Sequence, residues 1–223
     1  MDYRHEWKHP VGYAELPALR ARLRAVLPYD AHAVQGQYKV RSLYFDDLHD
    51  TALREKLDGV CSREKFRLRC YNGDASYLLL EKKCKRGALG WKEQTTLTAR
   101  QVRALLCGDR GALSDCGDPL LQELLRRMAE QGLRPKTLVD YTREPFVFAP
   151  GNVRVTLDHS IRTGLCCTDF LNPDCPTIPA GDADVILEVK WDAFLPAVIR
   201  DIVQVPNAHS AAFSKYAACR RYD

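Results

Sequence analysis

Apolar and polar residues alternate with a period of two along several stretches of the chain, which is typical of β-strands with two different faces. The clearest stretch is residues 63–69, in which four cations alternate with Glu64, Phe66 and Leu68. The pattern predicts strands over residues 3–9, 38–46, 60–71, 76–86, 91–98, 138–148, 153–162 and 184–191. Turn signals at Asn72-Gly73-Asp74 and Pro150-Gly151-Asn152 predict hairpins, and therefore an antiparallel sheet.

Other stretches carry apolar residues at helical spacing. Helices are expected over residues 13–27 and about 118–131, and shorter ones over about 46–57, 98–106, 195–203 and 210–221. Residues 163–183 are rich in Gly, Pro, Asn and Asp and are expected to form a loop. No repeat or linker divides the sequence, so residues 1–223 are expected to form a single domain.

These elements predict an α+β fold that is mainly antiparallel β. About eight strands joined mostly by hairpin turns are expected to form a closed or rolled barrel with the helices packed outside it. One face of several strands would be charged: Glu6 and Lys8; Arg63, Lys65, Arg67 and Arg69; Glu81, Lys83 and Lys85; Arg154, Asp158 and Arg162; Glu188 and Lys190. Lys92 and Arg143 would each add one cation.

The charged faces allow two arrangements. If they point into water, the protein is simply well solvated and the opposite faces fill the barrel. If the helices cover the apolar faces from outside, the charged faces line a tunnel. The amphipathic helices at residues 13–27 and 118–131 need an apolar surface to pack on, which favours the tunnel.

Composition adds limits of its own. The formal net charge is only +4, so a basic site must come from clustering of charge. No apolar run approaches the ~20 residues of a membrane span, and the N-terminus lacks the apolar core of a signal peptide, so we expect a cytoplasmic chain that does not enter the membrane. The nine cysteines contain no CxxC pair, which favours reduced thiols over a disulfide framework or a Cys/His metal site.

A tunnel lined by cations would select a polyanion. Arginine grips phosphate oxygens with a planar fork. The carboxylates between the cations are best explained as ligands of Mg²⁺ or Mn²⁺, which bridge carboxylate and phosphate oxygens. A metal ion and arginines around a phosphate chain are the equipment of phosphoryl transfer.

Eight motifs carry a family resemblance. They are Glu6-Trp7-Lys8-His9, Ser42-Leu43-Tyr44-Phe45-Asp46, Arg67-Leu68-Arg69-Cys70-Tyr71, Leu80-Glu81-Lys82-Lys83, Tyr141-Thr142-Arg143-Glu144-Pro145-Phe146, Val153-Arg154-Val155-Thr156-Leu157-Asp158, Ile186-Leu187-Glu188-Val189-Lys190 and Ser214-Lys215-Tyr216. In this order they resemble the VTC domain, the polyphosphate polymerase domain of the vacuolar transporter chaperone family, within the CYTH-like triphosphate tunnel metalloenzyme superfamily. The resemblance runs from about residue 3 to 221.

The resemblance implies an eight-stranded antiparallel tunnel that transfers the γ-phosphate of ATP to a growing polyphosphate chain with Mn²⁺ or Mg²⁺. The cations that match the family's phosphate-binding residues are Lys8, Arg67, Arg69, Lys83, Lys92, Arg143, Arg154 and Lys190. Glu188 matches the metal-binding glutamate, and Lys215 matches a basic residue at one tunnel mouth. Lys56, Lys65 and Glu81 fit the substrate-binding pattern, and Asp158 and Glu6 are further candidate metal ligands.

The chain departs from the superfamily's hydrolases at one position. Triphosphatases and adenylate cyclases have Glu-x-Glu-x-Lys on the first strand, and here Arg4 replaces the first glutamate. This argues for the polymerase and against a two-metal hydrolase. An inorganic triphosphatase and a non-catalytic polyanion-binding module remain alternatives. Nucleic acid is not the expected ligand, because the cations are predicted inside a lumen without stacking aromatic residues. A companion membrane protein is possible, since the membrane helices of the eukaryotic polymerase subunits are not found in this sequence.

Overall fold

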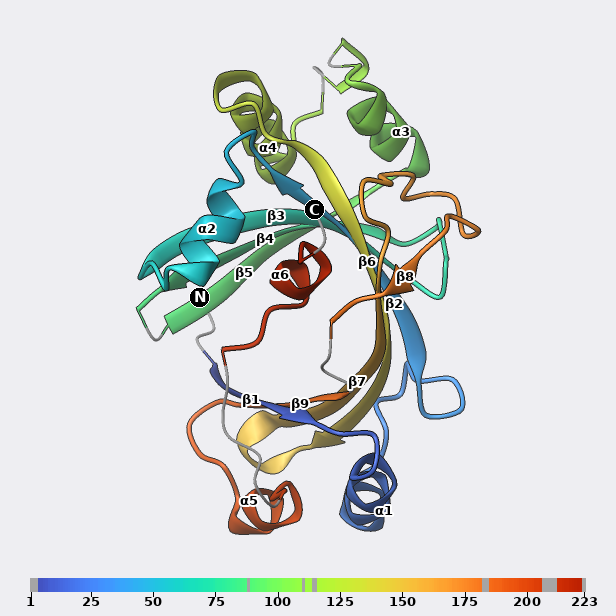
Figure 1. Ribbon diagram of the computed structural model, residues 1–223, viewed down its shortest axis with the longest axis vertical. Coiled ribbons are helices and arrows are strands. Elements are labelled where there is room, and N and C mark those ends of the chain that lie inside the picture. Colours follow the sequence, from blue (N-terminus) through green and yellow to red (C-terminus); the bar gives the residue numbers. More distant parts are fainter. Residues whose placement is uncertain are drawn as a thin grey trace.

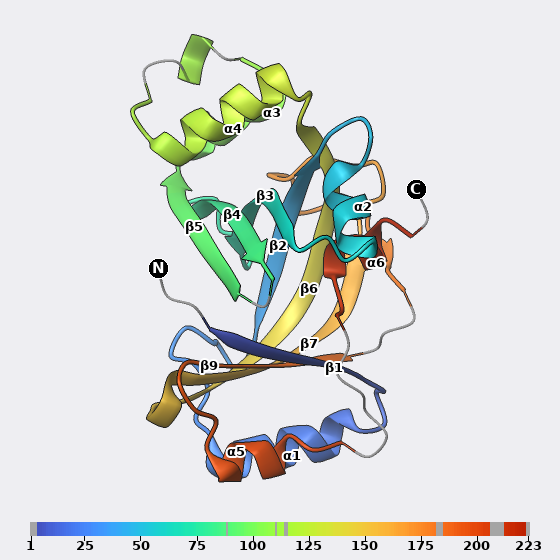
Figure 2. The same cartoon turned by 90° about the vertical axis from the view of Figure 1, so that its left-hand side faces the viewer.

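A single curved antiparallel sheet forms the body of the molecule (Figures 1 and 2). The computed structural model describes residues 4–87, 89–109, 111–113, 116–181, 185–205 and 212–221. The strands are β1 (His5–Val11), β2 (Tyr38–Asp46), β3 (Ser62–Tyr71), β4 (Leu78–Arg86), β5 (Leu89–Leu97), β6 (Arg134–Phe148), β7 (Val153–Thr163), β8 (Ile178–Pro179) and β9 (Val185–Trp191). Their order is β1-β9-β7-β6-β2-β3-β4-β5, with β8 added beside β7. The α+β class and the eight predicted strands are confirmed.

The predicted closed barrel is wrong. Among the described residues β1 and β5 do not pair with each other, so the sheet is an open half-barrel whose two edges face one another. Closure would bring the concave faces of β1, β4 and β5 together, and each carries a lysine there (Lys8, Lys83 and Lys92). Repulsion between these lysines opposes closure. One contact across the gap joins Lys83 Nζ to a carboxylate oxygen of Glu6, at 3.8 Å.

The helices are α1 (Leu16–Val26), α2 (Thr51–Leu57), α3 (Ala99–Cys107), α4 (Pro119–Glu130), α5 (Ala197–Ile202) and α6 (Lys215–Cys219), with short 3-10 turns η1 (Gly111–Leu113) and η2 (Pro150–Asn152). Side-chain caps stabilise the first turns of two of these helices. Thr98 and Gln101 form a capping box at α3, and Asp118 accepts a hydrogen bond from the Leu121 amide at α4. The helix predicted over 210–221 begins only at Lys215; residues 210 and 211 lie outside the described part of the chain.

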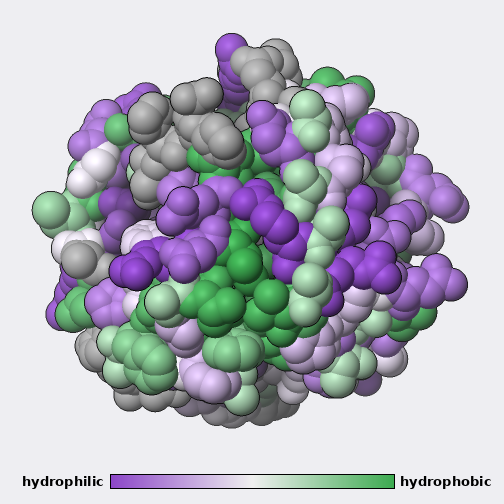
Figure 3. All heavy atoms as spheres, turned by 90° about the horizontal axis from the view of Figure 1, so that it is seen from below, coloured by the Kyte–Doolittle hydropathy of each residue, from purple (hydrophilic) through white to green (hydrophobic). Residues whose placement is uncertain are grey.

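Four helices cover the convex face of the sheet. Helices α3 and α4 bury Val102 and Leu124 against Phe66 and Leu80 of β3 and β4. Helices α1 and α5 lie at the other end of the molecule (Figure 1), over the apolar faces of β7 and β9. The face carrying α1 and α5 is apolar at its centre and hydrophilic around it (Figure 3). The apolar strand faces therefore point outward under helices, and the charged faces point inward.

Helix α6 lies in the hollow of the half-barrel, which corrects the expectation that all helices pack outside (Figure 1). It buries Tyr216 and Cys219 against Tyr44, Val139 and Tyr141 of the concave face. This end of the hollow is lined by aromatic and aliphatic side chains, so the fold buries it under a helix.

The structure also bears on the state of the cysteines and on membrane-spanning helices. The loop after β7 contains a disulfide between Cys167 and Cys175, whereas the sequence favoured reduced thiols; the other seven cysteines are not in disulfides. The loop folds back on itself, which the cysteine spacing alone did not reveal. Within the described ranges, no helix is long and apolar enough to cross a bilayer.

Candidate functional site

Strand register places charged residues of β1, β9, β7 and β6 side by side on the concave face. Lys8 stands directly opposite Glu188, and Lys190 stands between Glu6 on one side and Arg154 on the other. Arg143 of β6 stands opposite Asp158 of β7. Because side chains alternate along each strand, register alone turns these residues into one continuous charged surface.

The other half of the concave face is more strongly basic. Arg67 of β3 stands opposite Glu81 of β4, while Lys65, Lys83 and Lys92 stand in line across β3, β4 and β5. Three lysines directly opposite one another repel, and adjacent strands separate them by only about 5 Å. We call Lys65, Lys83 and Lys92 the lysine row.

Two carboxylates of the concave face are more deeply buried than two of its lysines. The carboxylates of Glu81 and Asp158 are completely buried, whereas Lys83 and Lys92 are 38% and 43% exposed. Glu81 and Asp158 thus form part of the wall, and Lys83 and Lys92 in front of them face the hollow. A ligand in the hollow would meet cations first.

Glu81 holds three cations in place. Its oxygens accept hydrogen bonds from Arg67 Nε at 2.6 Å and Lys92 Nζ at 2.9 Å, and Arg69 Nη1 lies 3.6 Å away. Burial alone would raise the pKa of Glu81, but Arg67, Arg69 and Lys92 outweigh it and hold the pKa well below its usual range. Glu81 stays ionised and orients the cations.

Asp158 plays the same part on the other side. Arg143 donates to both its oxygens, at 2.6 and 2.7 Å, and Lys215 Nζ donates at 2.6 Å. The Lys215 ammonium also lies 4.6 Å from the centre of the Tyr141 ring. Burial raises the pKa of Asp158, and Arg143 and Lys215 lower it further than burial raises it. Arg143 and Lys215 occupy the oxygens of Asp158, as Lys190 and Arg143 occupy those of Glu188, so a metal ion would have to displace a cation at either carboxylate.

Glu188 and Glu6 are the carboxylates that could hold a metal ion. Lys8 Nζ lies 3.1 Å from Glu6 and 3.9 Å from Glu188, and Lys190 Nζ lies 3.3 Å from Glu6 and contacts Glu188. Opposite Glu188, the buried hydroxyl of Thr156 has no hydrogen-bond partner among the described residues. These oxygens suit Mg²⁺ or Mn²⁺.

The described residues contain no group of three Asp, Glu, His or Cys side chains that could hold a metal ion. An ion beside Glu6 and Glu188 would therefore need phosphate oxygens to complete its coordination, as Mg²⁺ commonly does. The donor set fits a metal that arrives with a phosphate ligand.

Two lysines of the row are electrostatically strained. Burial, followed by Arg67, Lys8 and Lys56, lowers the pKa of Lys65 to about 8, against the opposing effect of Tyr44. Burial and then Lys8 lower the pKa of Lys83 well below its usual range. The Tyr44 ring lies next to Lys65 and Arg67, and these cations with Arg69 lower its pKa to about 8 although burial raises it. An anion would relieve this local excess of positive charge.

The remaining predicted residues lie around the same hollow. Arg154 donates to Asp30 and to the Tyr38 hydroxyl, both at 2.9 Å. Lys56 lies on α2, where burial, Arg63 and Lys8 lower its pKa. The structure thus brings every predicted site residue to the concave face or its margin, including Lys215 from α6.

Comparison with known proteins identifies the family. The family model for the VTC domain matches residues 3–222. The chain belongs to the VTC domain family. No curated protein matches it in sequence.

Solved structures similar to this VTC domain are distant in sequence. A candidate adenylate cyclase from Bacillus halodurans is 13% identical with a TM-score of 0.53, over 92% of this chain and 94% of that one. The PH1819 protein from Pyrococcus horikoshii is 11% identical with a TM-score of 0.45, over 90% of this chain and 84% of that one. At this identity the first likeness shows the fold alone.

Sequence reasoning missed several polar residues in the hollow of this VTC domain. Tyr38 and Tyr44 are on β2, and period two along residues 38–46 places them on one face, so a signal was present. Thr156 likewise lies between Arg154 and Asp158 on the concave face of β7. Asp30 comes from the segment between α1 and β2, where no periodic pattern points to a partner.

Proposed function

We propose that this VTC domain transfers the γ-phosphate of ATP to a growing inorganic polyphosphate chain held in the hollow of the half-barrel. The lysine row carries the proposal. Lys65, Lys83 and Lys92 stand opposite one another on three strands, next to Arg67 and Arg69. Such an arrangement costs stability in the absence of an anion, and a phosphate chain offers a negative charge on every phosphate.

The chemistry follows from charge. A terminal oxygen of the polyphosphate chain attacks the γ-phosphorus of ATP, the bond from that phosphorus to the β–γ bridging oxygen breaks, and ADP leaves. The attacking oxygen is already anionic, so no general base is needed. The barrier is repulsion between two polyanions and the charge that develops on ADP.

The chain's own residues meet these demands. The lysine row with Arg67 and Arg69 offsets the repulsion and holds the phosphates in line. Glu81 and Asp158 orient the cations from the wall. Glu6 and Glu188 would hold Mg²⁺ or Mn²⁺, which when bound neutralises charge on the transferred phosphoryl group. Lys8 and Lys190 contact both glutamates, and although burial raises the pKa of Glu188, these two lysines hold it well below its usual range.

Arg4 supports transfer over hydrolysis by two metals. It occupies the position of the first glutamate of the superfamily's hydrolases, and its Nε lies 2.8 Å from Asp192 while another nitrogen donates to the Asn152 carbonyl. Arg4 is therefore engaged at the end of β9 and supplies no carboxylate to the hollow.

The test incubates pure protein with ATP, Mn²⁺ or Mg²⁺ and a short polyphosphate primer, and a gel is stained for polyphosphate. We expect a ladder of lengthening chains with ADP in matching amount, and no ladder with EDTA. Phosphate release from tripolyphosphate without a ladder would assign the triphosphatase instead. Tight binding of polyphosphate with neither product would reduce the protein to a polyanion-binding module.

A further inference from the structure

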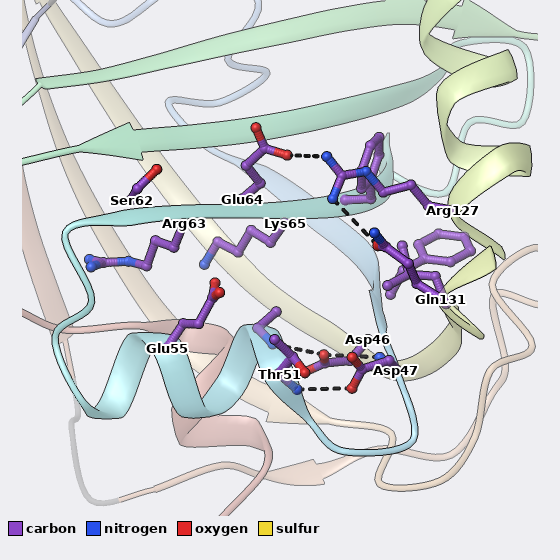
Figure 4. A pocket seen from close by; sticks show the side chains of 14 residues that line it. Asp46, Asp47, Thr51, Glu55, Ser62, Arg63, Glu64, Lys65, Arg127 and Gln131 are labelled. Carbon is purple, nitrogen blue, oxygen red and sulfur yellow. Dashed lines mark hydrogen bonds and ion pairs between the residues drawn. The ribbon is translucent and has the colours of Figure 1, made fainter.

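A cavity of about 320 Å³ lies between α2, the first half of β3 and the end of α4 (Figure 4). Its volume is at the lower end of the size of small-molecule sites. The lining combines an apolar part from Ala52 and Leu133 with polar side chains that include Glu55 and Lys65.

A fork in the sheet creates the cavity. Strands β2 and β3 pair only as far as Tyr44 and Arg67, after which β2 continues beside β6 alone. Residues from both faces of β3 can therefore line one space: Lys65 from the concave face, and Glu64 from the convex face. Because Lys65 also stands opposite Lys83, the cavity adjoins the lysine row.

Most carboxylates around the cavity already have partners. Asp46 accepts from the Ala52 and Leu53 amides and from the Tyr216 hydroxyl. Asp47 accepts from amides at the start of α2, and Glu64 accepts from Arg127 at 2.6 Å. These groups hold the walls together and have little capacity left for a ligand.

Glu55 and Lys65 are different. Within the described part of the chain, neither the Glu55 carboxylate nor the Lys65 ammonium forms a hydrogen bond or ion pair, although Lys65 lies over the Tyr44 ring. Figure 4 shows both side chains, with Arg63, pointing into the space between β3 and α2. Burial and then Asp46 raise the pKa of Glu55, so a hydrogen-bond donor beside it would be stabilising.

We propose that this cavity binds the nucleoside of a nucleoside triphosphate, with Glu55 accepting hydrogen bonds from the ribose hydroxyls while the phosphates lie on the lysine row. A ribose offers paired hydroxyl donors, which suit a carboxylate, and a base suits the apolar wall at Ala52 and Leu133. The inference rests on the proposed function, and adds a place for the nucleoside of the donor nucleotide beside the lysine row.

The test compares two ligands that differ only in the nucleoside. Binding of ATP and of tripolyphosphate is measured by calorimetry with EDTA, so that metal-dependent turnover consumes neither. We expect Glu55→Ala to weaken ATP binding at least about tenfold and to leave tripolyphosphate binding unchanged. Alanine keeps α2 helical. The matched control is Asp58→Ala, which removes an exposed carboxylate at the end of the same helix and should affect neither ligand.

A second variant covers the case in which another contact to the nucleoside compensates for the loss of Glu55. Ala52→Phe fills the cavity from α2, and should also weaken ATP binding while sparing tripolyphosphate. If both variants change the two ligands equally, or change neither, the nucleoside does not lie in this cavity. If the wild-type protein binds tripolyphosphate but not ATP, the proposed use of ATP fails together with this inference.

Discussion

The buried carboxylates Glu81, Asp158 and Glu188 are each matched with at least two cations. An isolated buried carboxylate is costly, and breaking a buried pair by removing one partner leaves an uncompensated charge. Glu188 is within reach of Lys8, Lys190 and Arg143, and Glu81 is within reach of Arg67, Arg69 and Lys92. At this scale the structure explains how a basic hollow stays folded: Glu81, Asp158 and Glu188 each anchor at least two cations that would otherwise repel freely.

Glu188→Gln tests the proposed metal site. The amide keeps the shape of the side chain but removes the charge that would attract a divalent ion, so turnover of ATP with primer should fall by about 100-fold or more. Tripolyphosphate binding in EDTA should persist or tighten, because the wall loses a negative charge. Circular dichroism checks the fold.

Asp140→Asn is the matched control for this variant. Asp140 lies on β6 and pairs with Arg41 at 2.8 Å, away from the candidate metal site, so its loss should leave turnover unchanged. A folded Glu188→Gln protein with wild-type turnover would remove Glu188 from the proposed metal site.

At the scale of elements, β3, β4 and β5 form a strained sheet. Each strand is well suited to pairing, and Phe66, Leu68 and Leu80 on the convex face are buried under α3 and α4. That burial offsets the repulsion within the lysine row on the other face. The strands therefore support a concave surface that would be unstable in an isolated sheet.

Lys83→Met should raise stability in a pH-dependent way. The folded-state pKa of Lys83 is lowered, so its protonation destabilises the folded protein at neutral pH, and this cost disappears as pH rises toward the unfolded-state pKa of about 10.4. Lys83→Met should therefore raise the free energy of unfolding at pH 7, and this gain should shrink at pH 9. Urea unfolding at both pH values measures it.

The exposed Lys39 of β2 provides the control for this comparison. Lys39→Met removes a lysine from outside the lysine row and should change stability little at either pH. A gain from Lys83→Met that grows between pH 7 and 9 would contradict the assigned direction of the Lys83 pKa.

At the scale of the whole molecule, the half-barrel is open along one side. Its edges, β1 and β5, carry Lys8 and Lys92 toward the hollow, and Glu6 reaches Lys83 across the gap. Helix α6 covers one end and ties Asp46, Asp50 and Asp158 together through Tyr216, Arg220 and Lys215. We expect the positive electrostatic potential of this hollow to dominate the association of the protein with a polyanion.

Tripolyphosphate should stabilise the molecule against heat. A ligand that binds only the folded state at 100 times its Kd adds about 2.7 kcal/mol, which corresponds to roughly 5–10 °C in Tm for a chain of this size. Because the attraction is between many charges, raising NaCl from about 0.05 to 0.5 M should remove most of the shift. A thermal scan in EDTA measures this, with NaCl of equal ionic strength as control. A shift that high salt leaves unchanged would argue against charge as its cause.

Much of the site could be predicted because the period of a strand is local. Arg67 and Arg69 share a face whatever surrounds them, and so do Glu188 and Lys190. The helix starts at Thr98 and near Asp118 were readable for the same reason, since a cap needs only its own first turn. Asp30 and Glu55 could not be placed, because their contacts depend on where a loop and a short helix pack.

By itself, the sequence determined the strands, the helices and which side chains share a face, because backbone geometry repeats every two or 3.6 residues. Only the tertiary structure decided that the charged faces turn inward, that β1 and β5 stay apart, that α6 lies in the hollow, and that a cavity opens where β2 leaves β3. These outcomes depend on packing and repulsion between residues far apart in the chain, which no local pattern records.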